Sequence, residues 1–308
     1  MSFNRLDKRS AVIDLGTNTF HLLIAEPAAD GGWTTLVRER IFVKLAEEGI
    51  ERIGPAAFER GLQAADVFRR HLDAAGIPPE RVRAYGTAAL RTAANAPDFL
   101  LAVQRRTGIR AEAIPGEHEA LLIYRGVRQA VPFPDNRAFI MDIGGGSVEF
   151  ILADRERLLW RQSFPVGVAV LFRQFHKSDP IAPGEIEAVQ RFLDEALSDL
   201  WAKLNEHPSP TLIGAAGAFD IIDHLLLDPA TKPPLYGWIP VDAFTPLYER
   251  IIGSTLAERE QMQHLMPERR EMVVMGMILI QQVLSRGRMR EIYTSEYSMK
   301  EGMLVGGN

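Results

Sequence analysis

The chain has 308 residues, of which 46% are hydrophobic and 24% charged, with a formal net charge of −5 and no cysteine. This composition is typical of a globular protein with about two domains. The acidic balance argues against a general nucleic-acid-binding protein, and the lack of cysteine excludes disulfides, thiol catalysis and cysteine-ligated zinc. The N-terminal MSFNRLDKRS has no apolar signal segment, and the most apolar run, MVVMGMILI, is too short to span a bilayer. We therefore expect a cytoplasmic enzyme or binding protein with no membrane partner.

Strand-like and helical patterns alternate along the first half of the chain. The expected strands are Ala11–Leu15, Phe20–Ala25, Trp33–Val43, Val82–Tyr85 and Ala111–Ile114. Helical patterns run from Pro55 to Ala75, after the NAP turn, and from Glu117 to Gln129. A Pro-rich break, AVPFPDN, follows at Ala130–Asn136 and is typical of a junction between domains.

The second half begins with another pair of strands and then becomes mostly helical. We expect a strand at Leu158–Phe164, a helix from Ala182 to Leu204 and a long helix at Glu268–Ser285. Alternating strands and helices predict an α/β protein with mixed sheets.

Two stretches of the sequence align with each other without a gap. AVIDLGTNTFHLLIAE (Ala11–Glu26) matches FIMDIGGGSVEFILAD (Phe139–Asp154), and each reads as a hairpin of two apolar strands around a tight turn. The matched pairs include Asp14 with Asp142, Gly16 with Gly144, and Thr19 with Ser147. A single recurrence half a chain away indicates two related lobes rather than a repeat array. We place the lobes at 1–128 and 129–308, with about the last ten residues packing back on the first lobe.

The two turns have the composition of phosphate-binding loops. Three consecutive glycines, Gly144–Gly146, expose backbone N–H groups to an anion, and hydroxyl residues flank both turns. Asp14 and Asp142 stand at strand ends, where carboxylates commonly hold a hydrated Mg²⁺. An aspartate that merely caps its own turn would look the same in a single copy. The matched pair favours a phosphate site.

Two further segments carry candidate catalytic residues. Arg91 is the one arginine among small residues in GTAALRTAAN. Its guanidinium is suited either to bind a specific anion or to form a structural ion pair. In IPGEHEALLIYRGV, Glu117 suits the first turn of a helix, whereas Glu119 precedes the apolar stripe and could activate a water molecule. His118 has no partner at metal-ligand spacing, so we expect it to be solvated.

Seven motifs occur along the chain in this order: IDLGTNTFHLLIAE, GTAALRTAAN, IPGEHEALLIYRGV, MDIGGGSVEF, LIGAAGAFD, MPERREMVVMGMILI and SMKEGML. Their order resembles that of the exopolyphosphatase/guanosine pentaphosphate phosphatase (Ppx/GppA) family. The resemblance implies an actin-like α/β fold with two ribonuclease-H-like lobes around a central cleft. It also implies hydrolysis of terminal phosphoanhydride bonds with Mg²⁺ or Mn²⁺. Orthophosphate would then be released from inorganic polyphosphate or guanosine pentaphosphate. A homodimer is compatible with the family.

The resemblance also implies roles for individual residues. Glu119 matches the glutamate that positions and deprotonates the attacking water, Arg91 the arginine that contacts the terminal phosphoryl group, and Glu149 a second essential acid. Asp14 and Asp142 match the carboxylates near the metal. The implied phosphate-binding residues are Gly16, Thr17, Asn18, Thr19, Gly144, Gly145, Gly146, Ser147 and Arg269. These residue types suit phosphoryl transfer to water without a phosphoenzyme.

The chain departs from the family pattern at four positions. Val148 and Ala218 stand where hydroxyl residues are common, His118 replaces a frequent acid, and Lys44 a frequent arginine. Longer relatives carry a C-terminal domain that resembles HD phosphohydrolases, and this sequence ends without it. Substrate preference therefore stays open between polyphosphate and guanosine pentaphosphate. An actin-like kinase and a non-catalytic sensor of polyphosphate or nucleotide are the alternatives from other classes.

Overall fold

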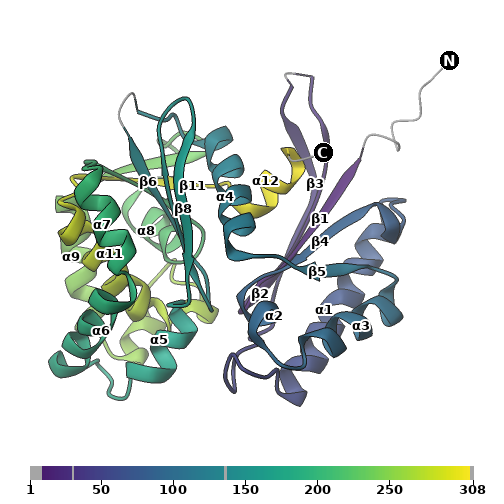
Figure 1. The fold of residues 1–308 in the computed structure, drawn as a ribbon, viewed down its shortest axis with the longest axis horizontal. Coiled ribbons are helices and arrows are strands. Elements are labelled where there is room, and N and C mark those ends of the chain that lie inside the picture. The colour runs from purple at the N-terminus through teal and green to yellow at the C-terminus, as the bar shows by residue number, and fades with distance from the viewer. Residues whose placement is uncertain (1–8, 30, 135–136, 306–308) are drawn as a thin grey trace. The chain divides into compact units, whose positions relative to one another are not determined.

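The computed structural model describes residues 9–29, 31–134 and 137–305. The chain divides into two compact units, one formed by Met1–Arg125 with Met299–Asn308 and the other by Gly126–Ser298. We call them unit 1 and unit 2. The polar N-terminal segment 1–8 and the last two residues of the Pro-rich break lie outside the described residues. Each unit is built around one mixed β-sheet (Figure 1).

Unit 1 contains a five-stranded sheet with the order β3-β2-β1-β4-β5. Its strands are β1 (Ser10–Leu15), β2 (Thr19–Pro27), β3 (Trp33–Phe42), β4 (Val82–Gly86) and β5 (Ala111–Ala113). β2 pairs antiparallel with both β1 and β3, whereas β4 pairs parallel with both β1 and β5. The predicted hairpin at Ala11–Glu26 is thus confirmed as β1 and β2.

Helices cover both faces of this sheet. On one face, α1 (Pro55–Ala74) and α3 (Ala96–Thr107) enclose a core in which Phe20, Phe68 and Phe99 are completely buried. α12 (Met299–Val305) contacts β1 and β2, so the C-terminal helix belongs to unit 1. The other helices of the first part of the chain are η2 (Pro79–Arg81), α2 (Ala88–Thr92) and α4 (Gly116–Ala130), which continues into unit 2.

Unit 2 contains a six-stranded sheet with the order β10-β11-β9-β6-β7-β8. Its strands are β6 (Ala138–Ile143), β7 (Val148–Ala153), β8 (Leu158–Phe164), β9 (Thr211–Ala215), β10 (Tyr236–Pro240) and β11 (Glu291–Ser295). From β8 to β11, the order and the strand directions match those from β3 to β5. β10 is an additional antiparallel edge strand. The internal repeat of the sequence therefore corresponds to two sheets of the same topology.

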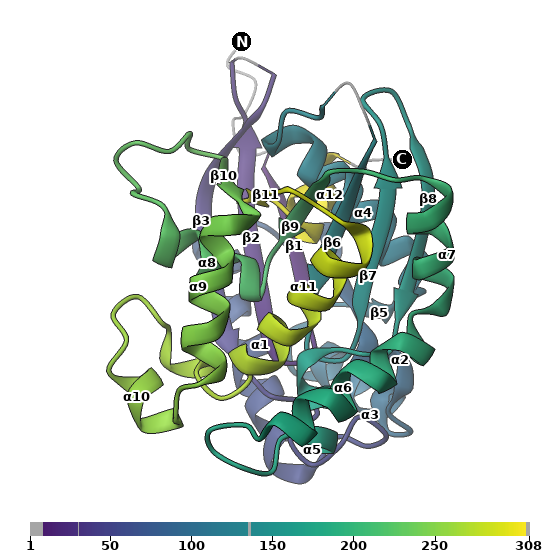
Figure 2. The ribbon, with the colours of Figure 1, turned by 90° about the vertical axis from the view of Figure 1, so that its left-hand side faces the viewer.

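One helix dominates the core of unit 2. α11 (Val273–Gly287) is buried almost all round, and Figure 2 shows it lying across the sheet with α6 and α9 beside it. The remaining helices are α5 (Val168–Phe175), α6 (Pro183–Ala196), α7 (Ser198–Glu206), α8 (Ala218–Leu226), α9 (Val241–Ile252), α10 (Leu256–Glu260) and η3 (Pro267–Arg269). α11 begins later than the predicted Glu268, because the short η3 turn precedes it.

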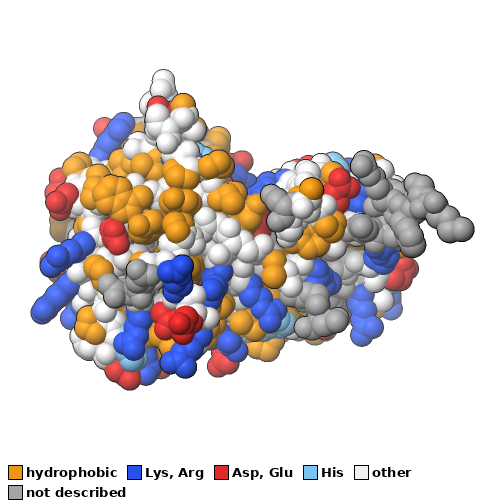
Figure 3. Space-filling model, turned by 90° about the horizontal axis from the view of Figure 1, so that it is seen from above, with side chains coloured by type: hydrophobic (Ala, Val, Ile, Leu, Met, Phe, Trp, Pro, Cys, Tyr) orange, Lys and Arg blue, Asp and Glu red, His pale blue; other side chains and the backbone are white. Residues whose placement is uncertain are grey.

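The surface of unit 2 includes an apolar area. Hydrophobic side chains gather over this unit on the face shown in Figure 3, with acidic and basic side chains around them. On the edge strand β10, Trp238 is exposed and donates a hydrogen bond to Glu291 at 2.9 Å. Within the described ranges, we find no helix whose length and hydropathy would let it span a membrane.

Candidate active site

Both repeated turns are closed by the same backbone hydrogen bond. Gly16 N–H donates to the Thr19 carbonyl at 3.1 Å, and Gly144 N–H donates to the Ser147 carbonyl at 3.0 Å. A Cβ atom at Gly16 would lie 2.6 Å from the Thr19 carbonyl oxygen, and a Cβ atom at Gly144 would lie 2.9 Å from the Ser147 carbonyl oxygen. Both distances are too short for a real side chain. Glycine is therefore required at both positions by the close approach of the backbone.

In unit 2, the start of α5 binds the carbonyl oxygens of the glycine turn. The N–H groups of residues 167–169 donate to the carbonyls of Gly144–Gly146 at 2.9–3.3 Å. Gly167 makes this possible, because a Cβ atom there would lie 2.3 Å from the Gly145 oxygen. Carbonyl oxygens would repel a phosphate, but these three already accept hydrogen bonds from the start of α5. The anion-binding capacity of this turn therefore lies in its N–H groups.

In unit 1, the corresponding turn is tied to the segment that carries Arg91. The Asn18 carbonyl accepts the Val43 N–H at 2.8 Å. The Thr17 side chain is 3% exposed, and its Oγ1 accepts the Ala89 N–H at 3.1 Å. This bond satisfies an N–H group in the first turn of α2, and α2 carries Arg91. The first turn thus helps to place the arginine.

Arg91 and Glu119 form a close ion pair within unit 1. Arg91 Nη1 lies 2.5 Å from Glu119 Oε2 and also donates to the Ile114 carbonyl at 3.2 Å. Glu119 is only 8% exposed. Burial raises the pKa of its carboxyl, and the charge and hydrogen bond of Arg91 only partly oppose this. The structure thus joins two predicted catalytic residues, and a raised pKa suits a carboxylate that accepts a proton near neutral pH.

Unit 2 contributes a second group of buried acids. Asp142 on β6 lies directly opposite Glu149 on β7, and the two are 7% and 1% exposed. The Ser298 hydroxyl donates to Asp142 Oδ2. Glu149 Oε1 accepts hydrogen bonds from the hydroxyls of Ser147 and Ser163, both at 2.7 Å. Two predicted acids and one predicted phosphate-binding serine are therefore neighbours in unit 2.

The structure places Arg269 beside another turn of unit 2. Its guanidinium contacts the Gly217 carbonyl and pairs with Asp220 at 2.8 Å. Gly217 has a φ of 55°, and a Cβ atom there would lie 2.4 Å from the Ile143 carbonyl oxygen. Arg269 thus holds the turn between β9 and α8 against the end of β6. Its predicted contact with a phosphate remains a prediction.

Oxygen donors suited to Mg²⁺ are present in both units. Asp14 is the last residue but one of β1 in unit 1, and Asp142 lies with Glu149 and Ser147 in unit 2. Among the residues that the structure describes, no three or more His, Asp or Glu side chains form a group that could hold a metal by themselves. Mg²⁺ usually binds through one or two carboxylates and keeps water and substrate phosphates as its other ligands. The donors present fit that mode.

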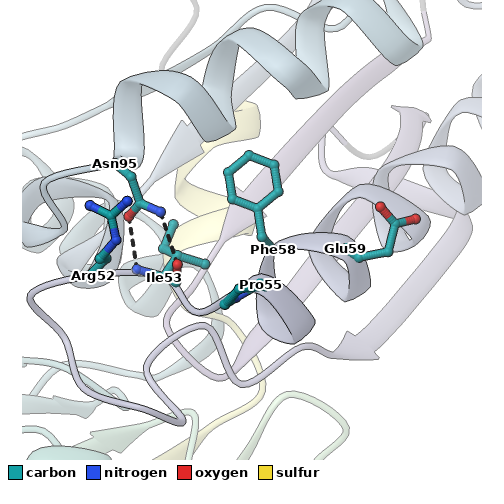
Figure 4. A pocket seen from close by; sticks show the side chains of 6 residues that line it. All are labelled: Arg52, Ile53, Pro55, Phe58, Glu59 and Asn95. Atoms are coloured by element: carbon teal, nitrogen blue, oxygen red, sulfur yellow. Dashed lines mark hydrogen bonds between the residues drawn. The ribbon is translucent and has the colours of Figure 1, made fainter.

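A pocket of about 320 Å³ opens at the start of α1 in unit 1 (Figure 4). Arg52, Ile53, Pro55, Phe58, Glu59 and Asn95 line it. The Asn95 amide donates to the Ile53 carbonyl and accepts the Ile53 N–H, both at 2.9 Å. The pocket contains none of the predicted site residues. Asn95 instead fixes the loop between β3 and α1 to the α2–α3 junction, next to the segment that carries Arg91.

Comparison with known proteins identifies the family. The model of the Ppx/GppA phosphatase family matches residues 23–307. The chain belongs to the Ppx/GppA phosphatase family. An exopolyphosphatase from Cytophaga hutchinsonii is 35% identical over 96% of both chains, with a TM-score of 0.91. The Ppx/GppA enzyme from Aquifex aeolicus shares the fold, with 24% identity, 96% and 98% of the chains covered and a TM-score of 0.78.

Family membership confirms the predicted actin-like fold and the predicted enzyme class, a phosphoanhydride hydrolase. Sequence reasoning nevertheless missed polar residues that hold this Ppx/GppA site together. Ser298 begins the quoted SMKEGML motif, but nothing in the sequence indicated its bond to Asp142. Ser163 lies in no recognised motif, because its bond to Glu149 depends on strand register. Asn95 follows Arg91 in the same motif and was read only as part of a turn.

Proposed function

We propose that this protein is an exopolyphosphatase that uses Mg²⁺ to release orthophosphate from the end of inorganic polyphosphate. Its similarity to the exopolyphosphatase from Cytophaga hutchinsonii supports this activity. The observation that carries the proposal is the Arg91–Glu119 pair, in which the buried Glu119 carboxyl has a raised pKa. A hydrolase of phosphoanhydrides needs such a base and such a cation at its reacting centre.

The two residues divide the chemistry of the reaction. Water attacks the terminal phosphorus while Glu119 accepts one of its protons. The bond between that phosphorus and the bridging oxygen breaks, orthophosphate leaves, and the shortened chain retains the bridging oxygen. Arg91 offers its guanidinium, whose planar fork of N–H donors suits phosphate oxygens, to the transferred group. No covalent intermediate on the protein is needed.

The repeated turns would bind the other phosphates. Their N–H groups provide donors without adding negative charge, and in the glycine turn the carbonyls are already held by α5. In unit 2, Asp142 and Glu149 would hold Mg²⁺, whose charge offsets that of the phosphates when it is bound. Asp14 is the corresponding carboxylate of unit 1. In this proposal the amide N–H groups bind the phosphates, and the carboxylates hold the metal.

The first test is phosphate release in the presence of Mg²⁺ from long polyphosphate, short polyphosphate and guanosine pentaphosphate. Glu119→Gln is expected to lower kcat by about 10²–10⁴-fold, because it removes the base. Glu117→Gln is the matched control, since Glu117 is an exposed acid in the same helix turn, and its activity should stay close to that of the wild type. Chelation of the metal should stop release.

Each other outcome points to another function. Release from guanosine pentaphosphate alone would assign the enzyme to that substrate. Binding of polyphosphate or nucleotide without any release would contradict hydrolysis and favour a sensor. Transfer of phosphate only in the presence of an added acceptor would favour a kinase.

A further inference from the structure

Glu149 is held by two serines from different strands. Its side chain is buried, and its Oε1 atom accepts hydrogen bonds from Ser147 and from Ser163, each at 2.7 Å. Ser147 precedes β7 in the glycine turn, whereas Ser163 lies on β8. Both hydroxyls reach the same oxygen, so they define one orientation of the carboxylate.

Strand register explains why Ser163 reaches this acid. Asp142 lies opposite Glu149, and Glu149 lies opposite Ser163, so the three form a row across β6, β7 and β8. Directly opposed residues on antiparallel strands have Cβ atoms about 4.5–5.5 Å apart, within reach of a serine–carboxylate hydrogen bond. The row is therefore built into the sheet rather than into a loop.

The two hydrogen bonds have a specific consequence for the carboxylate. The terminal torsion of a glutamate is broad and roughly two-fold, so one donor alone leaves the plane of the carboxylate weakly defined. A hydroxyl has a single proton to donate, so each serine commits its proton to Glu149. Together the serines fix the plane and satisfy part of the hydrogen-bonding demand of a buried acid.

We infer that Ser163 is a positioning residue for the phosphoanhydride hydrolysis, acting through the orientation of Glu149. The inference rests on the proposed function, in which Glu149 helps to hold Mg²⁺. Ser163 touches neither the water nor the phosphate in this assignment. Its contribution is the fixed direction in which Glu149 presents its carboxylate.

An isosteric pair of variants tests the role of the hydroxyl. Ser163→Thr keeps the hydroxyl, whereas Ser163→Val has nearly the same shape without it, and both suit a β-strand. We expect Ser163→Val to lower kcat by about 10-fold with the KM for polyphosphate unchanged, and Ser163→Thr to restore most of the loss. Gln162→Ala is the control, because Gln162 is the adjacent residue on β8 and bonds to Asp199 instead. It should behave like the wild type.

A double-mutant cycle separates positioning from a structural role. In the Glu149→Gln background, Ser163→Val should have almost no further effect on kcat, because the carboxylate that it orients is already gone. A further loss of about 10-fold in that background would show that Ser163 does not act through Glu149 and would overturn the inference.

Crystal structures of the two variants provide a readout that does not depend on activity. The Glu149 carboxylate should turn away from its present position in Ser163→Val and keep it in Ser163→Thr. An unchanged carboxylate in Ser163→Val would overturn the inference. Absence of phosphate release by the wild type would instead overturn the proposed function, and the same structures would still show whether Ser163 holds Glu149.

Discussion

The turn of unit 1 and the turn of unit 2 have the same backbone but different side-chain surroundings. Gly16 and Gly144 close them with equivalent hydrogen bonds and are both required by close contact with a carbonyl oxygen. In unit 2, Asp142 on the first strand of the hairpin faces Glu149, whereas in unit 1 the corresponding partner of Asp14 is His21. The repeat thus preserves the backbone of the turn, whereas the neighbouring side chains differ.

The divergence separates two kinds of chemistry. Unit 2 builds a row of carboxylates and hydroxyls directly on its sheet. Unit 1 has no acid opposite Asp14, and its proposed proton acceptor is Glu119, which comes from α4 and is paired with Arg91 on α2. The duplicated fold therefore has an arginine–glutamate pair in one unit and two opposed carboxylates in the other.

The largest effect in this comparison is expected from replacing Arg91, which tests whether the base of the reaction lies in unit 1. Arg91→Gln should lower kcat by about 10³-fold, because the transferred group loses its cation. Arg91 also lowers the pKa of Glu119, so its removal raises that pKa further above the ordinary value. A base must be deprotonated, and the rise of kcat/KM with pH should therefore shift to higher pH in the variant.

The pH–rate profiles of the wild type, Arg91→Gln and Glu149→Gln provide the measurement. The rise in the wild type should itself occur above the ordinary carboxyl range, since the pKa of Glu119 is raised. Glu149→Gln should lower the rate without moving this rise. A shift in Glu149→Gln instead of Arg91→Gln would assign the base to unit 2.

The second prediction compares the two residues at equivalent positions of the hairpins. Glu149→Gln is expected to lower kcat by about 10²-fold, the scale of removing one preorganised electrostatic group. His21→Gln, at the matched position, should change kcat by less than about threefold, because the proposed reaction gives it no role. Parallel kcat measurements on the two variants decide the point. Equal losses would mean that the two hairpins share their chemistry.

Much of unit 1 could be predicted because its patterns are long and regular. The predicted helix Pro55–Ala75 and strand Trp33–Val43 end within one residue of α1 and β3. β10 and β11 were missed, because β10 contains a glycine and a proline and β11 begins and ends with polar residues, so neither gives a clear apolar strand pattern. The predicted helix from Ala182 to Leu204 is interrupted at Leu197, where the backbone leaves helical geometry.

The site was predictable residue by residue but not as a set of contacts. Arg91 and Glu119 were each identified, yet whether the arginine binds an anion or forms an ion pair stayed open, because the two motifs are distant in sequence. The structure shows the ion pair, and the contact of the arginine with a phosphate remains a prediction. Ser163 could not be found at all, since only the register of β7 and β8 places it opposite Glu149.

The third prediction concerns the stability of the shared backbone. Gly16→Ala and Gly144→Ala should each lower the free energy of unfolding by about 1–3 kcal/mol through overpacking against a carbonyl oxygen. Gly16→Ala should cost more, because its Cβ atom would lie at 2.6 Å rather than 2.9 Å. Gly184→Ala is the control, since a Cβ atom there meets nothing within 4 Å. Urea unfolding measures all three, and a neutral Gly144→Ala would contradict the close contact in unit 2.

The smallest effect is expected at Thr17, whose equivalent in the second turn is Gly145. Thr17→Val removes the acceptor of the Ala89 N–H and should lower the free energy of unfolding by about 1 kcal/mol, whereas Thr17→Ser should keep it. Because Ala89 and Arg91 share α2, kcat should fall with stability in the valine variant, while the KM for polyphosphate changes little. A raised KM at unchanged stability would instead mean that the hydroxyl acts on substrate phosphate. In that case the side chains of the two turns, and not only their backbones, would serve the ligand.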